Sequence, residues 1–127
     1  MSSEQKFFFC KVCGSIVGRF YNKGKLICCK EEMTELIPNT VDASTEKHLP
    51  AVTVSGNVID VAVGSALHPM EEAHHINFVY LATKRGGQRK TLVVGETPKL
   101  AFSVTDDEPV AVFAYCNLHG LWKTDVV

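Results

Sequence analysis

Short apolar or alternating runs, separated by turn residues, recur from residue 51 to the end of the chain. The strands that these runs predict are Val52–Val54, Val58–Val63, Ile76–Ala82, Lys90–Val94, Leu100–Val104, Pro109–Tyr115 and Leu121–Val126. Seven strands at this spacing, with glycine-containing turns between several of them, predict an antiparallel sandwich of immunoglobulin-like architecture. The segment Ser65–His75 breaks the rhythm, and Pro69 followed by two glutamates predicts a short helical turn there.

The first forty residues follow a different pattern. Ser15–Tyr21, Asn22–Gly24 and Lys25–Ile27 read as strand, turn and strand, which predicts a hairpin that carries the chain back to Cys28 and Cys29. A piece of this size cannot hold together by core burial alone, so it needs a metal or a partner surface. Aromatic side chains supply apolar cover, as core or as a dimer contact: Phe7, Phe8, Phe9, Phe20 and Tyr21.

A small, polar stretch that opens with Pro38-Asn39 separates the two patterns and reads as a linker. The predicted organisation is a metal-bound hairpin module at 1–37, a linker at 38–45 and a β-sandwich domain at 46–127. The fold class is mainly β.

Composition narrows the possible partners of the 127-residue chain. A net charge of −1 provides no basic field for nucleic acid. No apolar run approaches the roughly 20 residues that a membrane helix needs, and Phe7–Phe9 is too short for a signal peptide. We therefore expect neither nucleic acid nor membrane as a partner, and a cytoplasmic location where thiols stay reduced.

The five cysteines are unevenly placed, four in the first quarter of the chain and Cys116 near its end. Clustered cysteines in a reducing compartment indicate a metal site more than disulfides. Cys10 and Cys13 form a Cys-x-x-Cys knuckle followed by Gly14. Cys28 and Cys29 are adjacent and would point to opposite faces of a strand, so the backbone must bend for both to bind one ion. This distortion favours iron, while a structural zinc knuckle and a disulfide framework remain alternatives.

A second set of donors lies at predicted loops and strand ends, namely His48, His68, His74, Cys116 and His119. Four imidazoles and one thiolate exceed the four ligands of structural zinc. Five donors leave one octahedral position free, which suits iron that binds a small molecule, and the thiolate pushes electron density onto the metal. The chemistry indicated is one-electron reduction of a small oxygen compound. His75 is the rival of His74, because adjacent side chains rarely face one ion.

These motifs carry a family resemblance. The four N-terminal cysteines resemble the desulforedoxin-type iron module. The segments 46–50 (Glu-Lys-His-Leu-Pro), 68–74 (His-Pro-Met-Glu-Glu-x-His) and 116–122 (Cys-Asn-x-His-Gly-x-Trp) resemble the superoxide reductase domain. Together they are similar to the desulfoferrodoxin family of two-iron superoxide reductases, over essentially the whole chain.

The resemblance implies two non-haem iron centres per chain. One is a distorted tetrahedral Fe(Cys)4 centre at Cys10, Cys13, Cys28 and Cys29. The other is an Fe(His)4(Cys) centre with His48, His68, His74 and His119 equatorial and Cys116 axial. It further implies reduction of superoxide to hydrogen peroxide without release of oxygen, rubredoxin as a typical electron donor, and a homodimer.

Two residues beside His48 acquire roles from the same resemblance. Lys47 would attract the superoxide anion and help to supply a proton, and Glu46 would occupy the sixth position of the ferric ion. Read without the resemblance, both belong to a solvated loop. The basic run 84–90 reads as a solvated hairpin tip, with docking of an acidic electron donor as the sharper alternative. Competing functions are a rubredoxin-like electron carrier, a zinc-stabilised interaction module and a superoxide dismutase.

Overall fold

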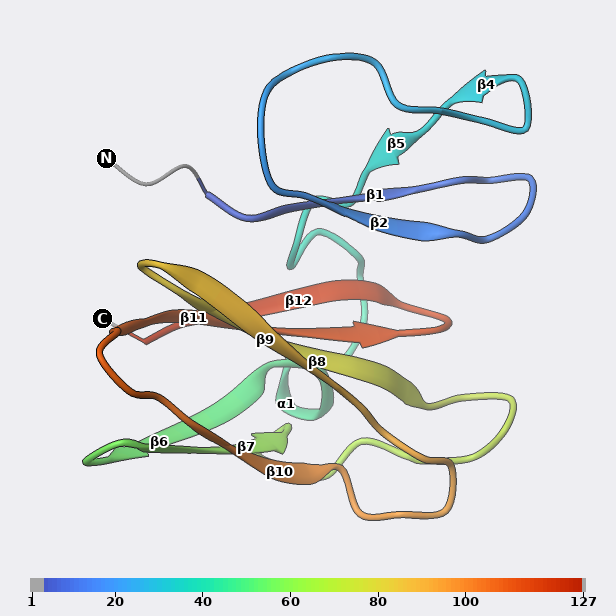
Figure 1. The fold of residues 1–127 in the computed structure, drawn as a ribbon. Helices are drawn as coiled ribbons and strands as arrows, with labels where there is room; N and C mark the ends of the chain where they lie inside the picture. Colours follow the sequence, from blue (N-terminus) through green and yellow to red (C-terminus); the bar gives the residue numbers. More distant parts are fainter. Residues whose placement is uncertain (1–3, 127) are drawn as a thin grey trace. The chain divides into compact units, whose positions relative to one another are not determined.

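A computed structural model describes residues 4–126, so residues 1–3 and 127 of the predicted domain ranges lie outside the described part. The described chain is mainly β, as predicted, and its contacts separate two compact units after Ile37 (Figure 1). The only helix among residues 4–126, α1 (Thr45–His48), has four residues, and no described helix is long and apolar enough to cross a membrane.

The first unit contains five short strands. They are β1 (Lys6–Phe9), β2 (Ile16–Arg19), β3 (Ile27–Cys28), β4 (Glu31–Glu32) and β5 (Thr34–Glu35). β1 is the centre of a three-stranded sheet in the order β2-β1-β5, and β3 pairs with β4. Buried apolar side chains in this unit are few: Phe7, Cys10 and Met33 among the described residues.

The predicted hairpin of the first unit is wrong in its pairing. β2 pairs with β1 through the register Phe9↔Ile16, so the turn that closes the hairpin is the Cys10–Gly14 knuckle itself. Gly14 has φ +81°, a left-handed conformation that glycine adopts without strain. Phe20 and Tyr21 follow the end of β2 and are largely exposed, at 85% and 89%, so they do not form core in this unit. The alternative, a dimer contact, stays a prediction.

The second unit is the predicted seven-stranded antiparallel sandwich. Its strands are β6 (Pro50–Ser55), β7 (Val58–Val63), β8 (Ile76–Thr83), β9 (Gly86–Thr91), β10 (Lys99–Ser103), β11 (Pro109–Cys116) and β12 (Gly120–Asp125). One sheet has the order β10-β7-β6 and the other β12-β11-β8-β9. The seven-stranded prediction is confirmed, with strand ends shifted by a few residues.

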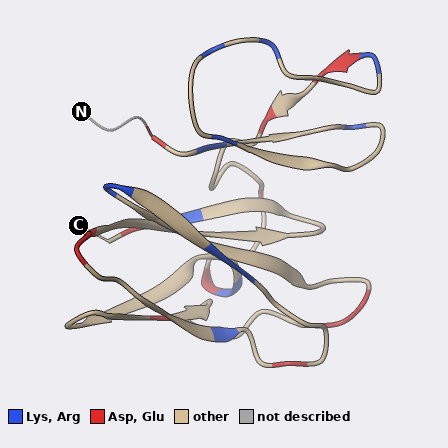
Figure 2. Cartoon of the chain, viewed as in Figure 1, with Lys and Arg blue, Asp and Glu red and all other residues tan. Residues whose placement is uncertain are grey.

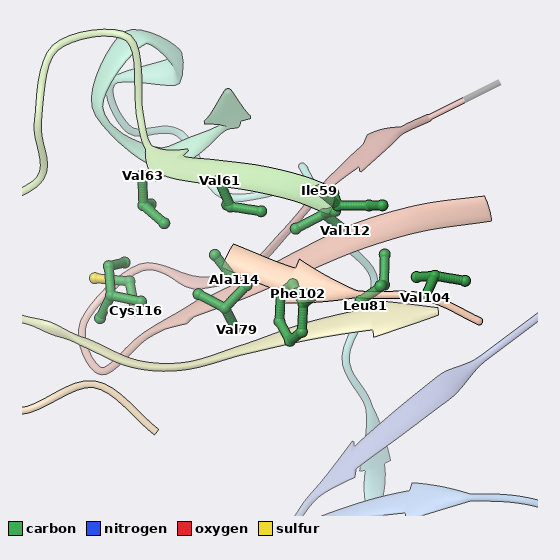
Figure 3. Close-up of a cluster of buried hydrophobic side chains, with 11 residues drawn as sticks. Ile59, Val61, Val63, Val79, Leu81, Phe102, Val104, Val112, Ala114 and Cys116 are labelled. Atoms are coloured by element: carbon green, nitrogen blue, oxygen red, sulfur yellow. The ribbon is translucent and has the colours of Figure 1, made fainter. Parts of the chain in front are cut away.

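The core of the second unit lies between these two sheets. The alternation along β7 buries Ile59, Val61 and Val63, which face the side chains of β8 and β11 (Figure 3). Cys116 lies at one end of this cluster, with its sulfur directed away from the row of aliphatic side chains (Figure 3). The apolar core therefore extends to the thiol.

The loop between β7 and β8 contains turns and no helix, so the helical turn predicted after Pro69 is wrong. Glu71 and His74 exchange two backbone hydrogen bonds, N to O at 2.9 and 3.0 Å, and so form an isolated antiparallel bridge. The N–H and C=O groups of Glu71 and His74 are thus paired with each other and not along a helix.

The start of the predicted linker is tied to the second unit. The Asn39 side chain donates to the carbonyl of Lys123 at 3.0 Å and accepts from its N–H at 2.8 Å. The Asn39 N–H also donates to the carbonyl of Leu121 at 3.0 Å. Residue 39 therefore lies along β12 and is not a free tether.

Candidate metal centres

The register of the sandwich brings the predicted ligands of the second unit to one end. Pro50, the first residue of β6, pairs with Val63, the last of β7. In the other sheet the end of β11, Cys116, pairs with Ile76 and Gly120, the first residues of β8 and β12. The predicted ligands therefore lie at this end, in the segment before β6, in the loop between β7 and β8, and at the end of β11 and its turn into β12.

The side chains converge to short distances there. One donor atom from each of His48, His68, His74 and Cys116 lies within 4.8 Å of the others. His119 adjoins the same group, with its Nδ1 at 3.1 Å from His48 Nε2 and 3.8 Å from Cys116 Sγ. The structure thus brings all five predicted donors together.

The hydrogen bonds of the rings define which nitrogen faces the centre. His48 Nδ1 donates to the carbonyl of Ser44 at 2.6 Å, and His68 Nδ1 donates to the carbonyl of Pro69 at 2.7 Å. In each neutral ring Nε2 then carries no hydrogen and exposes its lone pair. These two lone pairs lie 3.1 Å apart, which is repulsive unless a cation lies near both.

His74 adds a second sign that the donor cluster is suited to a cation. Its Nε2 is buried and has no hydrogen-bond partner among the described residues. Buried polar atoms are almost always paired, so an orphaned nitrogen next to two bare lone pairs fits a metal ion. The donor set of imidazoles and one thiol suits a transition metal.

Burial affects the protonation of the whole group. It lowers the pKa of His48, His68 and His74, that of His68 to about 4, so these rings are neutral and able to bind a metal at pH 7. Burial also raises the pKa of the Cys116 thiol, and N–H groups of Leu118 and His119 partly offset this by hydrogen bonding to its sulfur. A bound cation would favour the thiolate.

Trp122, on β12, contacts two of the predicted ligand residues, His48 and His119. Its indole stacks on His48, with ring centroids 4.9 Å apart and planes at 29°. Its Nε1 donates to the carbonyl of His119 at 3.1 Å. The Trp122 side chain is 3% exposed, so its position beside these histidines is held by the surrounding packing.

The short helix α1 carries the two predicted charged residues next to His48. Glu46 and Lys47 are exposed, and Figure 2 shows both an acidic and a basic segment on α1. The Lys47 charge is among the causes that lower the pKa of His48 and His74, so its field reaches the histidines. The structure does not bring the Glu46 carboxylate into the cluster of donors within 4.8 Å of one another.

His75 is turned away from the cluster. Its Nδ1 donates to the carbonyls of Glu71 and Glu72 at 3.0 and 3.1 Å. Sequence reasoning did not anticipate two supporting features, the Ser44 carbonyl and α1. A serine directly before Thr45-Glu46 is a typical helix N-cap and could have indicated α1.

The four N-terminal cysteines form a second cluster, with their sulfurs within 4.8 Å of one another. Cys13 Sγ lies 3.6 Å from Cys28 Sγ, and Cys28 Sγ lies 3.9 Å from Cys29 Sγ. The bend required by the adjacent cysteines is present, because Cys29 and Lys30 both have positive φ, 52° and 67°. All four are free thiols.

Protons are unevenly shared within this cluster. Hydrogen bonds from Ser15 lower the pKa of Cys13 to about 6, whereas hydrogen bonding to Cys10 and Cys13 raises the pKa of Cys28 to about 12. Four sulfurs at such distances cannot all be thiolates without a compensating cation. The cluster therefore fits a metal bound by four thiolates.

Fold and sites together define a metal-binding protein of the mainly β class, with a buried histidine–cysteine centre at one end of an antiparallel sandwich. The model of the desulfoferrodoxin family matches residues 40–125. A desulfoferrodoxin homolog of Archaeoglobus fulgidus is 39% identical over 98% of this chain and 99% of its own length. The desulfoferrodoxin of Syntrophotalea carbinolica is also 39% identical, over 98% and 99% of the two chains. This chain belongs to the desulfoferrodoxin family.

Solved structures give the same picture. The crystal structure of the superoxide reductase from Treponema pallidum matches with a TM-score of 0.81 and 35% identity, over 97% of this chain and 100% of that one. The one-iron superoxide reductase from Giardia intestinalis matches with a TM-score of 0.53 and 33% identity, over 63% of this chain and 96% of that one.

Proposed function

We propose that this protein is a superoxide reductase, which reduces superoxide by one electron to hydrogen peroxide without releasing oxygen. The observation that carries the proposal is the convergence of four imidazoles and one thiol at the end of the sandwich. The ligands proposed are His48, His68, His74, His119 and Cys116. Relatives over most of the chain bear the name superoxide reductase.

Ferrous iron at this centre would supply the electron, and five protein donors would leave one position for a small anion. The neutral rings and the thiol suit a metal that must change oxidation state, because the thiolate donates electron density. Trp122 and the carbonyls of Ser44 and Pro69 hold the rings in place, so little reorganisation is needed during the reaction.

Lys47 is the proposed attracting charge. The net charge of the chain is −1 and cannot steer an anion, but Lys47 is exposed and its field reaches His48 and His74. A single positive charge near the centre raises the local concentration of superoxide, and its ammonium group can organise the protons that the product requires. Glu46, on the same exposed helix, is proposed to displace the product.

The first unit is proposed to be a desulforedoxin-like module at 1–37 with iron bound by Cys10, Cys13, Cys28 and Cys29. The chain would then carry two non-haem iron ions, and 46–127 would form the superoxide reductase domain. The left-handed bend at Cys29 and Lys30 supports a distorted four-sulfur site. A rubredoxin-type electron donor, a homodimer and a cytoplasmic location complete the proposal, the last supported by five free thiols.

Stopped-flow mixing of the ferrous protein with superoxide tests the function. We expect oxidation of the histidine–cysteine iron with one hydrogen peroxide formed per superoxide and no oxygen evolved. Oxygen evolution would identify a dismutase. Absence of any reaction, with azide unable to bind, would leave an electron carrier, and two colourless zinc ions would indicate an interaction module.

A further inference from the structure

Two of the proposed ligands, His48 and His68, are oriented through their own rings by the carbonyls of Ser44 and Pro69. His74 is different, because its Nε2 is buried and has no hydrogen-bond partner among the described residues. Its N–H and carbonyl are held in the tight turn with Glu71, at 3.0 and 2.9 Å. This turn by itself does not connect His74 to the other ligand segments.

Asn117 supplies that connection. Its Nδ2 donates to the carbonyl of Ala73 at 3.0 Å, and its Oδ1 accepts the N–H of His75 at 2.8 Å. Its own N–H donates to the carbonyl of His75 at 3.2 Å. One residue therefore binds the backbone on both sides of His74, at positions 73 and 75.

The position of Asn117 in the sequence connects these bonds to the other proposed ligands. It follows Cys116 directly and lies two residues before His119, so it belongs to the turn that carries two other donors. We propose that Asn117 is a positioning residue that fixes His74 relative to Cys116 and His119 and so preorganises the metal centre. The amide is required because it donates on one side and accepts on the other.

The inference rests on the metal centre of the proposed function and adds a residue that binds no metal itself. Residues that orient metal ligands typically account for about 10- to 100-fold in metal affinity. The Asn117 side chain is exposed, so its hydrogen bonds contribute only modestly to the stability of folding. Loss of metal affinity should therefore exceed what loss of stability explains.

Asn39 offers a matched control in the same unit. It makes the same pair of side-chain hydrogen bonds, donating to the carbonyl of Lys123 and accepting from its N–H, but it brackets no proposed ligand. Asn39→Gly removes these bonds without backbone strain, because the φ of Asn39 is 62°. The four-cysteine cluster serves as a second control within each molecule.

The experiment is competition of Co²⁺ against a chelator, for wild type, Asn117→Ala and Asn39→Gly. The two centres are read separately, since a four-thiolate site and a mixed histidine–cysteine site give different visible bands. We expect Asn117→Ala to lose about tenfold or more in affinity at the histidine–cysteine centre alone, with thermal unfolding midpoints of the two metal-free variants lowered similarly. Asn39→Gly should keep its affinity within about twofold of wild type.

Equal affinity in Asn117→Ala and wild type, or equal losses in the two variants, would overturn the positioning role. Failure of wild type to bind a metal at this centre would instead overturn the proposed function. If Asn117→Ala does not fold, hydrogen exchange of the His75 amide in metal-free wild type decides the question. Protection supports a clamp that exists before the metal binds, and exchange at the rate of an unstructured amide contradicts it.

Discussion

The two centres differ in what surrounds them. The histidine–cysteine centre lies at the end of an apolar core in which Val63, Ile76 and Cys116 are fully buried. The four-cysteine cluster lies on turns of a unit with few buried side chains, and Cys13 and Cys29 are exposed. We therefore infer that the first centre is attached to a structure that folds without it, while the second replaces the core that its unit lacks.

Removal of both metals is the strongest test of this difference. We expect the metal-free chain to lose the structure of residues 4–37, because bound metal supplies most of the folding free energy of such a unit. The sandwich should remain folded, because its core lies between the two sheets. Amide hydrogen exchange, residue by residue, measures this, and protection throughout β1 and β2 without metal would contradict it.

Single cysteine substitutions separate the centres. Cys116→Ser should abolish the thiolate-to-iron absorption of the oxidised histidine–cysteine centre and leave the spectrum of the four-cysteine centre unchanged. Cys13→Ser should do the opposite and leave the reduction of superoxide largely intact. Optical spectra and iron quantitation provide the measurement, and simultaneous loss of both irons in either variant would show that the units depend on each other.

Gly64 allows a smaller perturbation of the second unit. A Cβ there would lie 2.5 Å from the carbonyl oxygen of Glu46 and 2.9 Å from that of Leu49, against the backbone of α1. Gly64→Ala should therefore displace the segment that carries His48 and destabilise the sandwich by about 1–3 kcal/mol. Gly24→Ala is the control, because nothing lies within 4 Å of its Cβ. Urea unfolding should distinguish the two, and equal midpoints would refute the close packing.

The metal-free histidines predict a dependence on pH. Burial lowers the pKa of His68 from 6.5 to about 4, so between these values the unfolded chain binds more protons than the folded one. The metal-free sandwich should thus lose stability as pH falls from 6.5 toward 4, and His68 should contribute no change above that range. Unfolding of metal-free wild type and His68→Gln across this range tests it; identical pH profiles would contradict the prediction.

Lys47→Ala is the mildest change. Removing the one charge should slow the reaction with superoxide by about tenfold or less and weaken its dependence on ionic strength, while iron remains bound. Lys84→Ala is a suitable control, since Lys84 pairs with Glu108 in the turn region beyond the far ends of β8 and β11. A rate constant unchanged by Lys47→Ala would reject the steering role.

Strand periodicity was the most informative signal for the fold. The alternation in β7 and the apolar runs of β8 and β11 predict strands by local pattern, and six of the seven strands of the sandwich formed where expected. β9 (Gly86–Thr91) instead begins within the predicted turn and overlaps the predicted strand Lys90–Val94 only at Lys90 and Thr91. The hairpin of the first unit was mispredicted because the pattern of 15–27 does not reveal that β2 pairs with β1 instead of with the segment that follows it. The loop after Pro69 was mispredicted because its backbone pairs locally between Glu71 and His74.

The amino-acid sequence alone determined which metal-donor side chains this protein has, since histidines and cysteines, and the predicted loops and strand ends that carry them, can be read from the sequence. It also determined the strands, because side-chain periodicity is a local property. Only the tertiary structure decided that Nδ1 of His48 and His68 is occupied by carbonyls, that His75 turns away, and that Asn117 brackets His74. These contacts join residues of different segments, and their geometry depends on the register of the folded sheets.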